Sequence, residues 1–272
     1  MFFSNFIVIF LACYLSIENI NCIQKKVIIS GREIHYRTEG HGEHTLLLID
    51  GTLGDIAANN FLNIYNNIDE NKFKVIQVDL LGYGRNQYEK RNYTDKFFFE
   101  KDARFLHEVM EALNEKEYSV AGWGYGGTVA LVLAGMFPKE IIKVVEWGAK
   151  PFISEEIIKQ AMSRSNIQNW DTPELIKQLK NHTRDYIIEC HKNLADGFRL
   201  LLNEKSGNLT QYFSKITVPT LLIHGIKDNY VKLEQPLEIQ KIITSARIET
   251  LQNASHSLHN DEDFINLIKG FL

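Results

Sequence analysis

A glycine-rich turn between two apolar segments constrains this chain of 272 residues more than any other feature. Residues 118–121 form a β-branched and aromatic run, Gly122-Trp-Gly-Tyr-Gly126 follows, and residues 128–135 have the composition of a buried helix. Glycines allow a strand to turn sharply and let the following helix lie against it. The chain therefore predicts a fold in which buried strands are followed directly by helices.

The rest of the chain repeats this alternation. Residues 26–30 and 32–37 predict a leading hairpin around Gly31, and further strands are predicted at 45–49, 73–78, 119–121, 142–146, 220–223 and 246–250. Helical patterns fall at 97–113, 127–136, 234–243 and 261–271. The alternation stops across residues 152–214, where helices are predicted at 153–162, 173–178 and 186–202. We expect a mostly parallel, doubly wound α/β sheet with a helical cap inserted above the carboxyl ends of the strands.

Several strand ends carry residues that suit the catalytic machinery of an α/β-hydrolase. In that fold the strand-turn-helix carries G-x-S-x-G, in which a strained turn exposes the nucleophilic serine. Here Gly124 occupies the serine position. Asp228 follows a late strand and His256 follows the last one, which is the order of acid and base in this fold.

At this point the chain resembles a particular family from about residue 26 to residue 272. It is similar to the valacyclovir hydrolase (biphenyl hydrolase-like) branch of the α/β-hydrolases, which are serine esterases acting on α-amino-acid esters. The motifs that carry this resemblance are Leu46-Leu-Leu-Ile-Asp-Gly-Thr-Leu-Gly54, Asp79-Leu-Leu-Gly-Tyr-Gly84, Gly122-Trp123, Gly126-Gly127, Trp147-Gly-Ala149, Asp196-Gly197, His224-Gly-Ile-Lys-Asp228 and Ser255-His-Ser-Leu-His259.

The resemblance implies a role for each matching residue. Asp228 would be the triad acid and His256 the base. The backbone N–H groups of Thr52 or Leu53, together with that of Tyr125, would form the oxyanion hole. The candidate substrate-binding residues are Tyr125 and Trp147.

Two departures from the family pattern fall at the reacting centre. The family carries Ser-Asp at the turn, where Ser attacks the ester and Asp pairs with the α-ammonium of the substrate, whereas this chain carries Gly124-Tyr125. A milder departure is Leu80-Leu81, where the family carries Pro-Arg. Loss of a hydrolase nucleophile costs ~10⁶ in kcat. Neither Ser119, which precedes the turn, nor Thr128, which follows it, is placed to replace the nucleophile.

These observations predict a catalytically degenerate hydrolase that binds a small, ester-like ligand or acts as an interaction protein. Three alternatives stay open. One is an enzyme that uses the Asp228–His256 pair as a base without a covalent step. Another is an active serine hydrolase of which this sequence is a variant. The last is a dinucleotide-binding protein, because Gly122-x-Gly124-x-x-Gly127 matches that fingerprint and Glu146 ends the next strand.

The amino terminus predicts passage through the secretory pathway. Residues 6–15 form an apolar run of signal-peptide length, so we expect a signal peptide at 1–22 and the hydrolase domain at 23–272, with no stable membrane span once the leader is removed. Four N-x-[ST] sequons agree with a secreted glycoprotein. They begin at Asn92, Asn181, Asn208 and Asn253.

The composition sets limits on the partners. A net charge of −4 provides no basic surface for nucleic acid. Neither the spacing of the nine histidines nor that of the three cysteines matches a metal motif, so no metal and no cofactor are expected.

Overall fold

The computed structural model describes residues 23–204 and 209–272. The predicted signal peptide at 1–22 and the predicted glycosylation site Asn208 lie outside the described residues, so both stay predictions.

The described strands form a single sheet of eight in the order β1-β2-β4-β3-β5-β6-β7-β8. β1 and β2 form the antiparallel hairpin, β2 pairs antiparallel with β4, and all other neighbours are parallel. The mostly parallel α/β sheet predicted from the sequence is therefore confirmed. The strands are β1 (Ile23–Ile29), β2 (Arg32–Glu39), β3 (His44–Ile49), β4 (Phe73–Val78), β5 (Tyr118–Trp123), β6 (Ile141–Trp147), β7 (Thr220–Gly225) and β8 (Ala246–Leu251).

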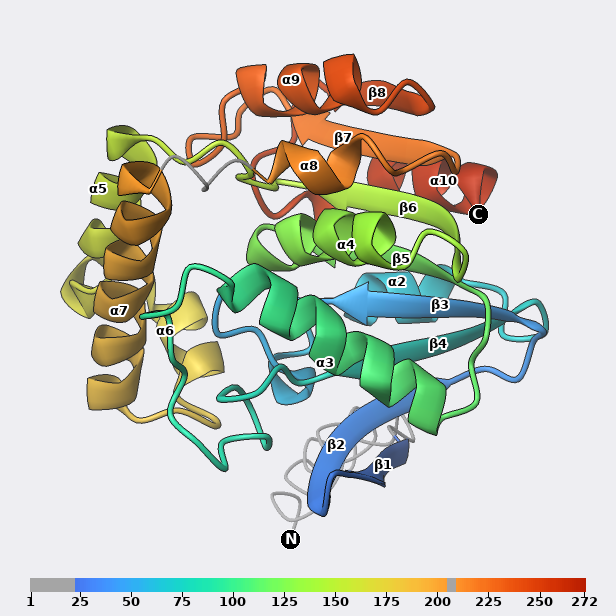
Figure 1. Cartoon of the computed structure of the whole chain (residues 1–272), viewed down its shortest axis with the longest axis horizontal. Coiled ribbons are helices and arrows are strands. Elements are labelled where there is room, and N and C mark those ends of the chain that lie inside the picture. The colour runs from blue at the N-terminus through green and yellow to red at the C-terminus, as the bar shows by residue number, and fades with distance from the viewer. Residues whose placement is uncertain (1–22, 205–208) are drawn as a thin grey trace, which may run out of the picture.

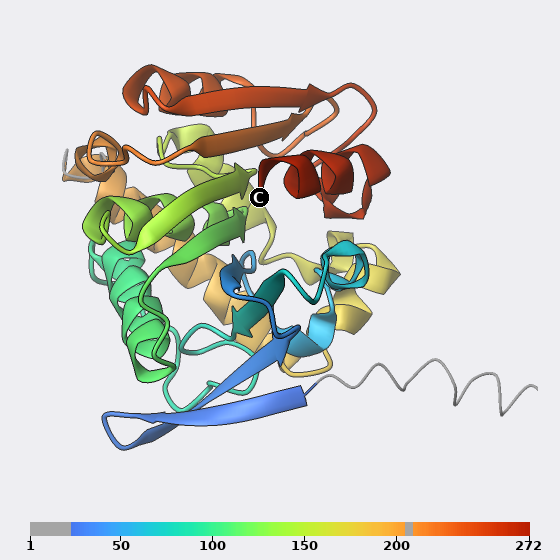
Figure 2. The same cartoon turned by 90° about the vertical axis from the view of Figure 1, so that its right-hand side faces the viewer.

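Helices cover both faces of this sheet (Figures 1 and 2). One face packs against α3 (Phe98–Ala112), α4 (Tyr125–Met136) and α9 (Glu234–Ile242), and α8 (Thr210–Phe213) lies on this side against α4 and α9. The other face packs against α2 (Leu62–Asn67) and α10 (Glu262–Phe271). Short 3₁₀ turns occur at η1 (Ile56–Ala58), η2 (Ile167–Asn169) and η3 (Leu258–Asn260).

The central strands and α4 are buried because their sequences are apolar on every side. In β3 the five residues after His44 are all buried, as expected of a parallel strand covered on both faces. In α4 the residues from Tyr125 to Gly135 are buried, since this helix lies between α3, α8 and the sheet. A helix that is apolar all round is stable only in such a position.

The cap consists of α5 (Glu155–Ser163), α6 (Thr172–Gln178) and α7 (Arg184–Asn203), which stand together at one end of the sheet (Figure 1). The predicted helices of the insertion are all present. The predicted range 152–214 also includes α8, but α8 packs against α4 and α9 rather than on α5–α7.

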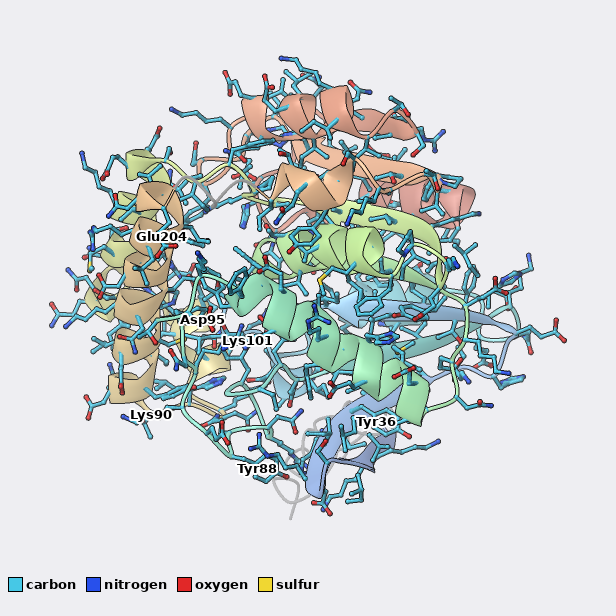
Figure 3. The ribbon with its side chains drawn as sticks, viewed as in Figure 1. Tyr36, Tyr88, Lys90, Asp95, Lys101 and Glu204 are labelled. Atoms are coloured by element: carbon cyan, nitrogen blue, oxygen red, sulfur yellow. The ribbon has the colours of Figure 1, made fainter. Side chains whose placement is uncertain are left out.

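Exposed ion pairs connect the cap with the segment before α3, and Figure 3 labels one member of each pair, Lys90 and Glu204. Lys90 lies 2.8 Å from Glu189 and Lys96 lies 2.7 Å from Glu204, both on or just after α7. Such exposed pairs each contribute at most about 1 kcal/mol, so they orient the cap more than they stabilise it. Among the described helices, none is both long and apolar enough to cross a membrane.

Candidate active site

Gly124 lies at the tight turn between β5 and α4 and has an unusual backbone conformation. Its φ is +58° and its ψ is −116°, which L side chains rarely adopt, and its N–H donates to the carbonyl of Trp147 at 2.8 Å. A Cβ built at this residue would lie 3.6 Å from Nε2 of His256 and 4.0 Å from the Cα of Gly51. The turn thus has the geometry that presents a nucleophile, and it has room for a small side chain facing the imidazole.

The flanking glycines are required by close backbone contacts. A Cβ at Gly122 would meet the Gly126 carbonyl oxygen at 2.3 Å, and one at Gly126 would meet the Asp50 and Ile49 carbonyl oxygens at 2.3 Å. These glycines let α4 start directly against β5 and β3.

The dinucleotide interpretation needs a free carboxylate at Glu146. That side chain is buried, and its Oε2 accepts the Ala149 N–H at 3.0 Å. Burial raises the pKa of Glu146 to about 8. The geometry therefore does not support dinucleotide binding at this turn.

His256 and Asp228 come together from two loops that are 28 residues apart in the chain. His256 Nδ1 lies 2.8 Å from Asp228 Oδ2, while Asp228 Oδ1 accepts the N–H groups of Tyr230 at 2.7 Å and Val231 at 2.9 Å. Burial raises the pKa of Asp228, but the hydrogen bond and charge of His256, with these two N–H groups, outweigh burial and hold the pKa below its ordinary value. A proton on Nδ1 leaves Nε2 as the lone-pair nitrogen that faces Gly124.

Gly148 makes room for this imidazole. Its φ is +73°, and a Cβ there would lie 2.6 Å from Cε1 and 3.0 Å from Nδ1 of His256. In the sequence, Gly148 stands out only as the middle residue of the motif Trp147-Gly-Ala149, which indicates no role for it. The structure shows that its role is to let the ring approach the backbone.

The candidate oxyanion turn follows β3. The Gly54 N–H donates to the Gly51 carbonyl at 2.9 Å, and Leu53, in the middle of this turn, has a φ of +58°. Thr52 lines the cavity described below, whereas the Leu53 side chain is fully buried. Tyr125 is the first residue of α4, so its N–H belongs to the first turn of a helix, where amides lack intrahelical acceptors.

The Tyr125 side chain contacts the cavity but does not fill it. Its hydroxyl donates to Asp102 Oδ2 at 2.7 Å and accepts from Arg91 at 2.8 Å. Arg91 and Asp102 form a buried ion pair, and the Tyr125 ring stacks on Phe99 at 4.8 Å. The phenol is therefore part of a buried polar cluster, and Tyr125 is also among the residues that line the cavity.

The prediction that Trp147 binds substrate needs a correction. Its side chain is completely buried, packs at 4.8 Å on Phe264 and lies among the residues on the α10 face of the sheet. The side chains of a strand alternate between faces, and this one points away from the cavity. Trp123 lines the cavity instead, and its Nε1 donates to the His256 carbonyl at 3.1 Å.

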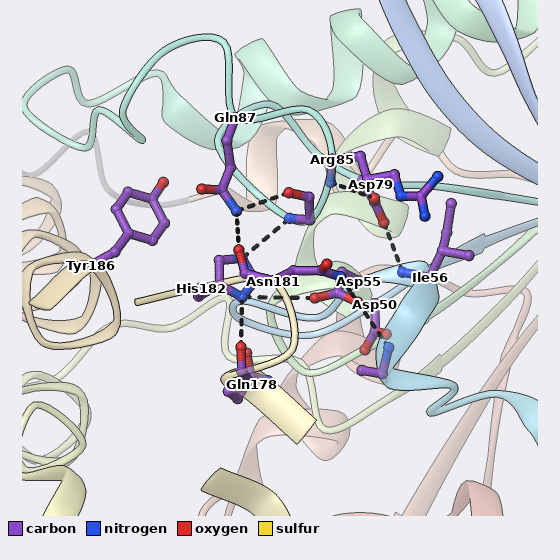
Figure 4. A network of polar contacts seen from close by, with 12 residues as sticks. Asp50, Asp55, Ile56, Asp79, Arg85, Gln87, Gln178, Asn181, His182 and Tyr186 are labelled. Carbon is purple, nitrogen blue, oxygen red and sulfur yellow. Dashed lines mark hydrogen bonds and ion pairs between the residues drawn. The ribbon is translucent and has the colours of Figure 1, made fainter. Parts of the chain in front are cut away.

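Three buried carboxylates lie behind the candidate oxyanion turn (Figure 4). Asp50 accepts from the Gly51 N–H, and Asp79 accepts from the N–H groups of Ile56 and Arg85. Burial raises the pKa of both groups to about 7.

The third carboxylate, Asp55, connects this loop with the cap. It accepts from the Asn181 amide at 3.1 Å, and its Oδ2 lies 3.7 Å from Nδ1 of His182. His182 Nε2 accepts the Gly84 N–H at 3.1 Å, which places the ring proton on Nδ1, and burial lowers the pKa of this ring. These contacts hold the cap on the loops that follow β3 and β4.

A cavity of about 400 Å³ lies between the turn and the cap. Its floor contains Gly51, Gly124 and His256, and its roof contains residues from α5 to α7. Among the polar lining residues that were not predicted as site residues are Lys150, Arg164 and His191. No local sequence pattern around these three residues indicates a site.

The described sequons differ in accessibility. Asn92 and Asn253 are exposed, whereas Asn181 is half-buried with its amide nitrogen bonded to Asp55. Glycosylation of all three stays a prediction. Across residues 23–204 and 209–272, no group of three His, Cys, Asp or Glu side chains is arranged to hold a metal ion.

Comparison with known proteins agrees with this geometry. A family model described as the alpha/beta hydrolase fold matches residues 44–163. Among solved structures, a serine hydrolase involved in carbazole degradation aligns with a TM-score of 0.71 at 20% identity, over 92% of this chain and 98% of that chain. The enol-lactonase from Burkholderia xenovorans also aligns with a TM-score of 0.71, at 18% identity over 91% of this chain and 99% of that one. The protein therefore has the α/β-hydrolase fold.

Two curated serine hydrolases show a more specific similarity to this chain. Serine hydrolase BPHL of Homo sapiens is 29% identical over 252 residues, which are 91% of this chain and 85% of the relative. Serine hydrolase BPHL of Mus musculus is 28% identical over 250 residues, with the same coverage of both chains. The resemblance to this branch that was inferred from the sequence is confirmed.

Proposed function

We propose that this protein is a catalytically degenerate α/β-hydrolase that binds a small molecule in the cavity above Gly124. The observation that carries the proposal is that Gly124, at the turn between β5 and α4, faces a His256–Asp228 pair that keeps the geometry of acid and base. The cavity supports a binding role because it is not filled by Tyr125. The family that the sequence resembles acts on esters, which suggests an ester-like ligand.

A second function is favoured by one specific feature. His256 Nε2 faces open space next to Gly124 and carries the free lone pair, so it could activate a water molecule or remove a proton from a bound substrate. Such an enzyme would need no covalent intermediate.

The distinguishing experiment is an esterase assay on aminoacyl and p-nitrophenyl esters. The full chain would be expressed in cultured animal cells, and the purified protein compared with His256→Ala. Under the degenerate proposal, wild type and variant give the same rate, close to that of buffer. Turnover by the wild type that His256→Ala abolishes would refute it and establish the base-only mechanism.

We also propose that the protein is secreted and glycosylated. The support is the apolar segment near the amino terminus and the exposure of Asn92 and Asn253. In the same expression experiment, the protein should be recovered from the medium, and glycosidase treatment should increase its gel mobility. Recovery from the cytosol with unchanged mobility would contradict this proposal. The substitutions Asn92→Gln and Asn253→Gln would identify the modified residue.

A further inference from the structure

Three cap-side residues give one wall of the cavity a positive character. Lys150 follows β6, Arg164 ends α5, and His191 lies in the middle of α7. All three line the cavity, and they belong to the cap or to the segment that leads into it.

Lys150 has no carboxylate partner among the described residues. Its ammonium nitrogen lies 3.5 Å from Gln160 Oε1 and 5.8 Å from the ring centre of Tyr230. Burial, the largest effect, lowers the pKa of this group to about 8, Asp228 opposes the change and Arg164 adds to it. A cation held by one amide and one aromatic ring has little to replace its hydration.

His191 is the second unsatisfied group. It is 5% exposed, and neither of its ring nitrogens has a hydrogen-bond partner in the part of the chain that the structure describes. Its ring meets that of Trp170 edge-on at 5.3 Å. Burial, followed by the charges of Arg164 and Lys150, lowers the pKa of His191 to about 3, so the ring is neutral and offers one N–H donor and one acceptor.

Arg164 completes this wall. Its guanidinium lies 3.8 Å over the Trp170 ring and forms an ion pair with Glu174. Because Glu174 neutralises it in part, Arg164 contributes less net charge than Lys150. The remaining charged residues of the lining are Asp171 and Lys177, which are both exposed.

We propose that the cavity binds a ligand that carries a carboxylate, which is received by the Lys150 ammonium and the His191 N–H beside Arg164. This inference rests on the proposed ligand-binding function and names the class of ligand. A carboxylate would provide the charge that Lys150 lacks and the acceptor that His191 lacks, while the apolar lining of Phe99, Leu194 and Phe198 holds an apolar body. A ligand that carries an ammonium group would meet repulsion at this wall.

The test uses three probes that share a phenylpropyl body: 4-phenylbutanoate, 4-phenylbutanamide and 4-phenylbutylamine. Binding to the full-length protein is followed by tryptophan fluorescence, because Trp123 and Trp170 line the cavity. A hydrogen bond to a charged group contributes about 1.5–3 kcal/mol, so we expect the carboxylate to bind roughly 10–100-fold more tightly than the amide. The amine should bind more weakly than either.

The variants assign the effect to Lys150. Lys150→Met should remove the preference for the carboxylate without weakening the amide, and Lys150→Arg should retain it. Lys159→Met, an exposed lysine on α5, is the matched control and should behave as wild type. If Lys150→Met does not fold, His191→Phe provides the second test and should reduce carboxylate affinity alone.

The outcomes separate the two proposals. Equal binding of the three probes, tighter binding of the amine, or an unchanged preference in Lys150→Met would overturn the carboxylate inference and leave the binding function intact. Absence of binding by all three probes would refute the ligand-binding function for arylalkyl molecules and the carboxylate inference with it.

Discussion

Placing a serine hydroxyl at residue 124, in the turn between β5 and α4, is the most direct perturbation of this site. A Cβ at residue 124 would lie 3.6 Å from His256 Nε2, so a serine oxygen can reach hydrogen-bond distance in a suitable rotamer. The Tyr125 phenol supports the buried Arg91–Asp102 pair, so reverting Gly124 alone perturbs the fold less than reverting both residues. We expect Gly124→Ser to hydrolyse p-nitrophenyl acetate at least about a hundredfold faster than wild type, a fraction of the ~10⁶ that a nucleophile contributes.

The same substitution should destabilise the fold. With φ at +58° and ψ at −116°, a side chain at this residue costs about 1–3 kcal/mol. For a domain of this size each kcal/mol lowers Tm by about 2–4 °C, so we expect a decrease of roughly 2–12 °C. Gly124→Ala has the same backbone cost and no hydroxyl, which makes it the matched control.

The assay compares initial rates and thermal unfolding for wild type, Gly124→Ser, Gly124→Ala and the double variant Gly124→Ser, His256→Ala. The reasoning holds if only the single serine variant gains activity and both single variants melt below wild type. A folded Gly124→Ser protein no more active than Gly124→Ala would refute the argument that His256 and Asp228 keep a catalytic geometry around residue 124. Equal melting temperatures would refute the strain argument.

Three further predictions concern the surrounding structure. In the Gly124→Ser background, Gly148→Ala should abolish the restored esterase activity, because the new methyl group would meet the His256 ring at 2.6 Å; unchanged kcat would contradict this role. Arg91→Leu should lower the free energy of unfolding in urea by about 3–5 kcal/mol, since it leaves a carboxylate buried and unpaired; a loss under about 1 kcal/mol would argue against the pair. The pKa of Asp50 rises from 3.8 to about 7 on folding, so its ionisation lowers the free energy of unfolding progressively as pH rises from about 4 to 7. Asp50→Asn should therefore gain stability relative to wild type over that window, by on the order of 4 kcal/mol at most. Parallel pH profiles of the two proteins in urea unfolding would count against this.

Local patterns were sufficient to predict the strands and most of the helices. Continuous apolar runs such as that in β3 are read directly as buried strands, and the amphipathic spacing of α3 is read directly as a helix. The short α2 and α8 were missed because four to six residues carry too little periodicity to be distinguished from a loop.

The candidate catalytic frame was also accessible from the sequence. In a parallel sheet the loops after the strands meet at one edge, so the order of Gly124, Asp228 and His256 along the chain predicts that they converge. The error at Trp147 has a simple cause: its motif indicated the right loop, but the face of the strand to which a side chain points depends on register.

The sequence by itself determined the fold class, the alternation of strands and helices, and the resemblance to one branch of hydrolases. It also determined that a glycine stands where that branch carries its nucleophilic serine. Those properties depend on neighbours in the chain and on motifs with characteristic spacing. Only the tertiary structure decided that Gly148 accommodates the imidazole and that Lys150 and His191 line one cavity without partners. Burial and pairing depend on residues that are distant in the chain, and they become visible only once the cap is folded over the sheet.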